Sequence, residues 1–256
     1  MQLLLVFQGM TRARAAEASP EQMLRKATLA RTAGMRAKYA RRGLSRANEL
    51  DETTKVMLLR QLYLAQMEAR RFDEALQISL QMVALEVMPD VARQDAARAC
   101  LGLGAVDRAI EHLRLASRVC PASRRAFHYW TLGSTLYLTG RHDEAISALS
   151  RAVRWGTSDR PLYRGQLALA RIANGEEVDD LHALRENLTD APCGQGYGQF
   201  VLGEIAYHQG DLESAQRYLR GFVERSTSGR IALSVALKAE VARARRLLSR
   251  IRRRLK

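Results

Sequence analysis

The chain has 256 residues, of which 47% are hydrophobic, and its formal net charge at pH 7 is +14. This apolar content can bury a large core, and a composition rich in Ala, Leu, Arg and Glu but poor in Pro and aromatic residues indicates an all-α protein. The three cysteines are odd in number and widely spaced, so they do not indicate a disulfide framework, and their use fits a reducing compartment.

Residues 1–19 begin with an apolar segment, MQLLLVFQGM. Its apolar run of about five residues is shorter than the core of a secretory signal, and no basic region precedes it. No later apolar segment has the length needed to span a bilayer. We therefore expect a soluble, cytoplasmic protein in which residues 1–19 form a loose leader or a short helix, with either Met1 or Met10 as the start.

A turn position followed five residues later by an alanine recurs along the chain. The pairs are Met35 with Ala40, Arg70 with Ala75, Gly104 with Ala109, Gly140 with Ala145, and Gly210 with Ala215. Gly175 fills the remaining turn position, with Asp180 in place of the alanine. Successive turns are 35, 34, 36, 35 and 35 residues apart. This regularity is typical of stacked helical hairpins.

The fourth hairpin, residues 131–152, shows the pattern most clearly. Gly140 separates two helices whose apolar or small positions are spaced by threes and fours. These positions are Leu132, Gly133, Leu136, Tyr137, Ala145, Leu149 and Ala152. Gly133, and Gly203 at the same position of the sixth hairpin, lie inside predicted first helices and are expected to allow close helix packing.

This segment resembles the tetratricopeptide repeat (TPR), a helix–turn–helix unit of about 34 residues. Leu132 and Gly133 stand at the paired Leu-Gly positions of the family and Gly140 at its turn, whereas Leu136 stands where the family usually has Tyr. The resemblance implies an all-α fold, a right-handed α-solenoid of stacked helix–turn–helix repeats with a C-terminal capping helix. We expect one solenoid over residues 20–226, with repeats at about 21–53, 54–88, 89–121, 125–158, 161–191 and 195–226.

Residues 227–256 are predicted to form one basic amphipathic helix, whose start resembles the helix that caps the last repeat in this family. Its apolar residues recur every three or four positions. Its basic surface consists of Arg243, Arg245, Arg246, Arg250, Arg252, Arg253, Arg254 and Lys256. These residues could contact nucleic acid or an anionic membrane.

In the resembled family, the first helices of the repeats line a concave groove that binds extended or helical peptides. Carried over position by position, the groove residues are Arg25, Arg60 and Arg98 in repeats one to three, Phe127, Trp130, Ser134 and Tyr137 in repeat four, and Tyr197, Phe200, Glu204 and Tyr207 in repeat six. A groove that is basic at one end and aromatic at the other suits a partner peptide with acidic and apolar anchors. The alternative for each aromatic residue is packing between neighbouring repeats.

The sequence carries no catalytic or metal-binding motif. Its five histidines are scattered, without the HExxH or paired Cys/His spacing of a zinc site, and it has no nucleophile elbow. We therefore expect no catalytic residues, no metal and no cofactor.

The first hypothesis for function is a non-enzymatic scaffold or adaptor for protein–protein interaction, which holds a partner segment in the groove. The alternative is that the C-terminal helix binds nucleic acid or an anionic membrane surface. Neither the identity of the partner nor the oligomeric state follows from the sequence.

Overall fold

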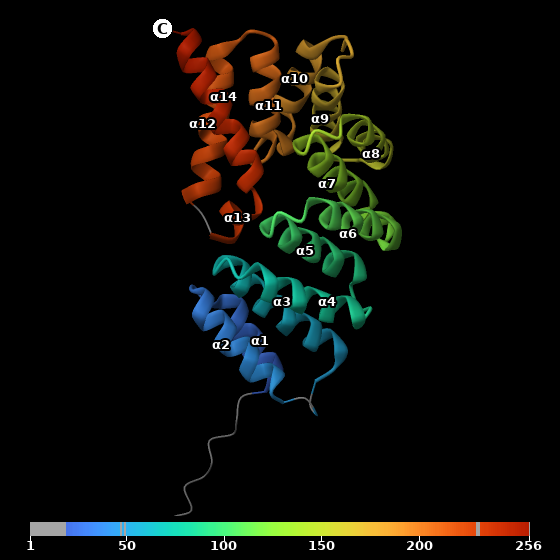
Figure 1. Cartoon of the computed structure of the whole chain (residues 1–256), viewed down its shortest axis with the longest axis vertical. Helices are drawn as coiled ribbons and strands as arrows, with labels where there is room; N and C mark the ends of the chain where they lie inside the picture. Colours follow the sequence, from blue (N-terminus) through green and yellow to red (C-terminus); the bar gives the residue numbers. More distant parts are fainter. Residues whose placement is uncertain (1–18, 47, 49, 229–230, 256) are drawn as a thin grey trace, which may run out of the picture.

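Figure 1 shows the computed structural model, which describes residues 19–46, 48, 50–228 and 231–255. Within these ranges the chain is all-α, with 14 α-helices and no strand, as the sequence predicts. Of the predicted leader, only Ser19 is described, and its side chain caps the first helix. None of the described helices is both long and apolar enough to cross a bilayer.

Six helical hairpins stack one on the next into an elongated, curved body (Figure 1). The hairpins are α1 (Pro20–Leu29) with α2 (Ala33–Leu44), α3 (Glu52–Glu68) with α4 (Phe72–Ala84), α5 (Pro89–Gly102) with α6 (Val106–Val119), α7 (Arg125–Leu138) with α8 (His142–Trp155), α9 (Arg160–Ala173) with α10 (Leu181–Asp190), and α11 (Gly198–His208) with α12 (Leu212–Ser228). The second helix of each hairpin also contacts the first helix of the next. Each hairpin thus buries its apolar face against its neighbours, which is the arrangement of an α-solenoid.

Five of the six hairpin turns lie at the predicted residues. The φ angles there are 57° at Arg70, 77° at Gly104, 80° at Gly140, 82° at Gly175 and 79° at Gly210. This left-handed conformation ends a helix, and glycine adopts it without the steric cost that a side chain brings.

The first predicted turn, at Met35, is wrong. Met35 lies inside α2, because the side chain of Thr32 accepts a hydrogen bond from the Met35 amide and starts the helix at Ala33. The chain turns before Thr32, where Ala30 has an extended conformation.

Close packing at Gly133 and Gly203 is confirmed. A Cβ atom built on Gly133 would lie 2.5 Å from Cγ of Leu149, and one built on Gly203 would lie 2.6 Å from Cγ of Leu219. The two glycines therefore let α7 approach α8 and α11 approach α12 more closely than any side chain would allow.

The C-terminal segment differs from the single helix expected over residues 227–256. It contains α13 (Ile231–Ala236) and α14 (Lys238–Arg254), and the helical geometry is interrupted at Leu237, with φ −103° and ψ 23°. Helix α13 contacts α3 as well as α12, whereas α14 packs along α12. One straight helix could not make both sets of contacts. In Figure 1, α13 lies at the end of the last repeat that faces the N-terminal repeats.

Candidate interaction groove

The first helices of repeats four and six meet through two predicted groove residues. The hydroxyl of Tyr137 on α7 donates a hydrogen bond of 2.7 Å to Oε2 of Glu204 on α11. Both side chains are almost fully buried, with 1% of each residue exposed. A buried carboxylate needs hydrogen-bond donors, and Tyr137 supplies one of them.

A second polar chain connects repeats four, five and six. Ser134 on α7 and Tyr197, the residue before α11, are joined by a hydrogen bond of 2.7 Å between their hydroxyl groups. Gln166 on α9 donates from Nε2 to Oγ of Ser134 at 2.9 Å and accepts from Nε1 of Trp130 at 2.6 Å. The rings of Trp130 and Tyr197 meet edge to face, with centroids 4.9 Å apart.

Gln166 is a groove residue that the sequence reasoning missed. It is fully buried and holds three predicted residues, Trp130, Ser134 and Tyr197, in one network. The sequence offered one indication, because Gln166 is an uncharged polar residue next to the apolar residues 167–170 of α9. A polar side chain that is buried there needs hydrogen-bond partners.

Two side chains of the C-terminal helix reach this network. Arg243 on α14 donates from Nε to Glu204 and from Nη2 to the hydroxyl of Tyr137. Its guanidinium carbon lies 4.6 Å from the centroid of the Tyr137 ring. One turn earlier, Glu240 accepts a long hydrogen bond of 3.5 Å from Tyr197. Arg243 therefore belongs to the groove rather than to the basic surface predicted for this helix.

Burial dominates the electrostatics of the site. It raises the pKa of Glu204, against the opposing effect of the Arg243 guanidinium. It also raises the pKa of Glu240 to about 7. For Arg243, burial lowers the pKa, but the attraction of Glu204 and Tyr137 outweighs it and the pKa rises.

The other aromatic residues predicted for the groove lie in three different environments. Phe200 has no exposed surface and packs on Phe222 with ring centroids 5.2 Å apart, so it is a core residue. Phe127 remains 37% exposed. Tyr207 is partly exposed, and the guanidinium carbon of Arg254 lies 5.4 Å from its ring centroid.

The predicted basic end of the groove is largely neutralised. Arg60 and Arg98 both pair with Asp95, at 3.0 Å and 3.5 Å, and the Asp95 side chain is only 1% exposed. Burial raises the pKa of Asp95, and the two arginines oppose that rise. Arg25, on α1, is exposed. These contacts do not favour an acidic anchor at Arg60 and Arg98.

The basic surface of α14 is narrower than the sequence predicts. Lys256 lies outside the described residues, and Arg243 points into the groove. The exposed arginines of the helix are Arg245, Arg246, Arg250, Arg252, Arg253 and Arg254. On the opposite face, Val241, Ala244, Leu247, Leu248 and Ile251 are buried.

The ionisable residues do not form a metal centre in the described part of the chain, where no group of three or more His, Cys, Asp or Glu side chains could hold an ion. His128 is buried and lies 2.8 Å from Oδ2 of Asp90, which also pairs with Arg124. Burial lowers the pKa of His128, against the opposing effect of Asp90. This cluster joins α5 to the start of α7 and is a structural contact.

Comparison with known proteins agrees with the repeat architecture. Residues 129–155 match a family model described as a tetratricopeptide repeat. No curated protein shows significant similarity to the chain.

Among solved structures, the chain is similar to MamA, with 19% identity, a TM-score of 0.44, and coverage of 70% of this chain and 95% of that chain. It is also similar to a putative kinesin light chain from Podosopora anserina with nearly identical TPR-like repeats, with 17% identity, a TM-score of 0.45, and coverage of 79% and 95%. Likeness at this level carries no information on function. Residues 129–155 therefore form a tetratricopeptide repeat, and the other helical hairpins stack on either side of it.

Proposed function

We propose that the protein is a non-enzymatic scaffold for protein–protein interaction, and that its concave groove at repeats four to six holds an amphipathic helix of the partner. The observation that supports the proposal is that this groove accommodates such a helix in the free chain. Helix α14 places Arg243 on Glu204 and Tyr137, while its buried apolar face packs along α12. Binding a helix by its apolar face in a groove is a common mode of peptide recognition.

The groove residues define the chemistry of the partner. Glu204 is buried and requires a cation, and Tyr137 offers both its hydroxyl and its ring to the same guanidinium. The partner helix therefore carries an arginine with apolar residues one turn before and after it, and it takes the place of α14. This differs from the acidic anchor that the sequence suggests.

The test uses a fluorescently labelled peptide with the sequence of residues 238–256. In the wild-type chain α14 competes with the peptide at high effective concentration. In an Arg243→Ala chain this competition is weaker, so we expect the peptide to bind the variant at least about tenfold more tightly than the wild type. A peptide with Ala at position 243 should bind neither chain.

The control is an Arg246→Ala chain, because Arg246 is exposed on the same helix. It should bind the peptide as weakly as the wild type does. Circular dichroism must show equal helix content in all three chains. Equal affinity of both peptides for the Arg243→Ala chain would contradict the proposal.

The exposed arginines of α14 support a second candidate function, contact with nucleic acid. The apolar face of the helix is buried against the solenoid, so it is not free to enter a bilayer, and the cations alone face solvent. Six phosphate contacts predict that log Kd changes with log salt concentration with a slope of about 5. Replacing Arg250, Arg252 and Arg253 with Ala should lower that slope by about 3, as measured by titration of duplex DNA at several salt concentrations. An unchanged slope would exclude this role for α14.

A further inference from the structure

A cleft is lined by residues of α6, α7 and α8. In Figure 1 these helices lie on the right of the view and α14 lies on the left. It encloses about 220 Å³, and Leu132, Leu136 and Ala148 form its floor. The rest of its lining consists of Arg114, Ser117, Arg118, Tyr129, Glu144, Ser147 and Arg151. An apolar floor with polar groups at the rim is typical of a binding site.

The two helices α7 and α8 carry a ladder of arginine–aromatic pairs that begins in this cleft. The guanidinium carbon of Arg151 on α8 lies 5.5 Å from the ring centroid of Tyr129 on α7. One helical turn further along, the guanidinium carbon of Arg125 on α7 lies 4.8 Å from the ring centroid of Trp155 on α8. Residues four apart share one helix face, so both pairs face the same side of the molecule.

The arginines of the ladder are held in place without being neutralised. Neither Arg125 nor Arg151 forms an ion pair with any residue in the described part of the chain, and the same is true of Arg154, which also contacts the Trp155 ring. Nη1 of Arg151 donates a long hydrogen bond of 3.5 Å to the hydroxyl of Tyr129, and its other N–H groups can still bind a carboxylate. Arg118, across the cleft on α6, is exposed and likewise lacks an ion pair among the described residues.

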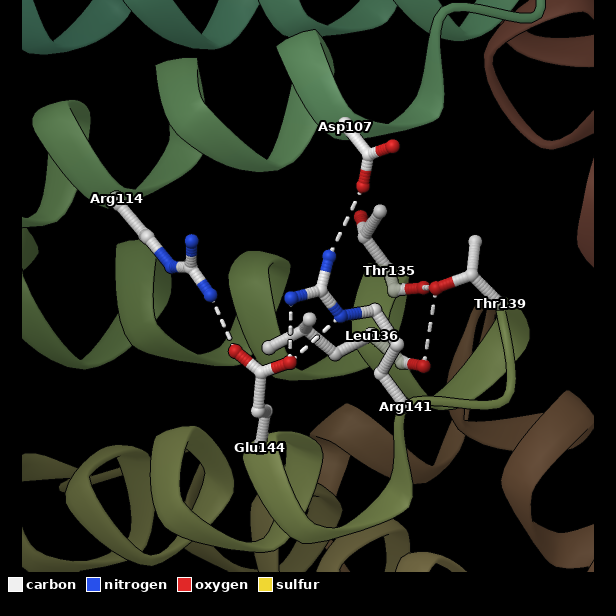
Figure 2. A network of polar contacts seen from close by, with 7 residues as sticks. All are labelled: Asp107, Arg114, Thr135, Leu136, Thr139, Arg141 and Glu144. Atoms are coloured by element: carbon white, nitrogen blue, oxygen red, sulfur yellow. Dashed lines mark hydrogen bonds and ion pairs between the residues drawn. The ribbon is translucent and has the colours of Figure 1, made fainter.

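The other edge of the cleft is a closed ionic network, shown in Figure 2. Glu144 accepts hydrogen bonds from Arg114 on α6 and from Nε of Arg141, the latter at 2.6 Å. Arg141 also pairs with Asp107 at 3.1 Å. Arg114 and Arg141 are therefore satisfied within the protein, and this network fixes α6 relative to α8. The unpaired cations lie on the remaining rim.

We propose that this cleft binds an acidic segment of a partner protein. An aliphatic side chain of the segment packs over Leu132 and Leu136, and neighbouring carboxylates pair with Arg118 and Arg151. Trp155, 48% exposed, extends the surface along the ladder. Arginine, tyrosine and tryptophan are the residues that dominate binding energy in protein interfaces.

A protein segment fits this cleft better than single-stranded nucleic acid. Bases bind by stacking on free aromatic faces along a continuous basic groove. Here Arg151 lies over the ring of Tyr129, both Arg125 and Arg154 lie over the ring of Trp155, and Glu144 interrupts the basic lining. The proposal goes beyond the groove of repeats four to six, because none of its residues contacts α14.

The test uses the full-length protein and a labelled peptide of alternating Glu and Leu, with fluorescence anisotropy at near-physiological salt. We expect Arg118→Glu/Arg151→Glu to weaken peptide binding at least about tenfold. The matched control is Arg217→Glu, since Arg217 is also exposed and also stacks on a tyrosine, Tyr218, at 5.4 Å. The control should change the affinity by less than about twofold.

Intrinsic fluorescence locates the bound peptide independently. The chain has two tryptophans, and Trp130 is hydrogen-bonded within the groove whereas Trp155 is exposed beside the cleft. Peptide binding should change the emission of the wild type, and Trp155→Phe should bind the peptide without that change.

Four outcomes would overturn the proposal. The first is no peptide binding to the wild type, and the second is equal binding by Arg118→Glu/Arg151→Glu and Arg217→Glu. The third is that a single-stranded oligouridylate binds the wild type more tightly than the Glu/Leu peptide does, and the fourth is that a Lys/Leu peptide binds as tightly as the Glu/Leu peptide. Since Arg243 and Glu204 are unchanged in every variant, these outcomes do not depend on the groove.

Discussion

Arginine has different roles on the two sides of this solenoid. In the concave groove, Arg243 reaches a carboxylate that is 1% exposed and is neutralised by it. In and beside the cleft between α6, α7 and α8, Arg151 and Arg125 lie over aromatic rings and meet no carboxylate of the described chain. The first arrangement fixes a helix in place, and the second leaves charge available to a ligand.

This contrast shows why a net charge of +14 says little about binding by itself. A cation on a buried carboxylate contributes to stability, because its removal leaves an uncompensated buried charge. A cation stacked on an exposed ring contributes little to stability and keeps its hydrogen-bonding capacity. Substitutions on the two sides should therefore separate stability from binding.

The largest expected effect is that of Arg243→Ala. It leaves Glu204 buried without its cation, and we expect a loss of about 3 kcal/mol in the free energy of unfolding. The measurement is urea denaturation followed by circular dichroism. Arg246→Ala, on the exposed face of α14, should stay within about 0.5 kcal/mol of the wild type. A similar loss in both variants would remove the contrast between the two kinds of arginine.

Gly133→Ala should lower stability by disturbing α7, which carries residues of both the groove network and the cleft. The new methyl group would clash with Leu149, and we expect a loss of about 2 kcal/mol. Gly34→Ala is the control, since a Cβ atom at Gly34 meets nothing within 4 Å. Thermal unfolding of the two variants should separate steric conflict from the change in backbone flexibility.

Glu240→Gln tests the groove through pH. Burial raises the pKa of Glu240 from its usual 4.5 to about 7, so between these values the folded chain binds more protons than the unfolded chain. This contribution to stability is complete below about pH 4.5 and is lost as the pH rises towards about 7. The wild type should lose about 1–2 kcal/mol more than Glu240→Gln over this range.

Denaturant midpoints measured across that pH range would check this prediction. The groups that act on Glu240 are the hydroxyl of Tyr197 and the positive charge of Arg98, and both lower its pKa against the effect of burial. Parallel curves for wild type and variant would mean that Glu240 is not buried.

The smallest expected effect is that of Glu144→Ala in the network of Figure 2. Both Glu144 and its partner Arg114 have side chains about two-fifths exposed, 41% and 42%. Solvent screens such a pair, so the expected loss is below about 1 kcal/mol. A double-mutant cycle with Arg114→Ala would measure the coupling. A loss as large as that of Arg243→Ala would mean that exposure does not distinguish the two regions.

The sequence determined the repeating architecture of this protein. Helical periodicity, a turn every 34 to 36 residues and the glycines at close-packed positions are local features, and five of the six predicted turns are in place. The same local pattern placed the first turn wrongly at Met35. The sequence does not distinguish Thr32, which caps α2, from threonines that cap no helix. Among the residues predicted for the groove, Ser134 contacts Tyr197 and Tyr137 contacts Glu204, and their role in binding a partner stays a prediction.

Only the tertiary structure decided which residues fill the groove. The contact of Tyr137 with Glu204 joins positions 67 residues apart, and its contact with Arg243 joins positions 106 residues apart. Such contacts depend on the curvature of the whole stack, to which every helix interface contributes. They also depend on the break at Leu237, which sets the direction of α14. No local pattern encodes them, so the sequence did not reveal that Arg243 of the chain's own last helix pairs with Tyr137 and Glu204.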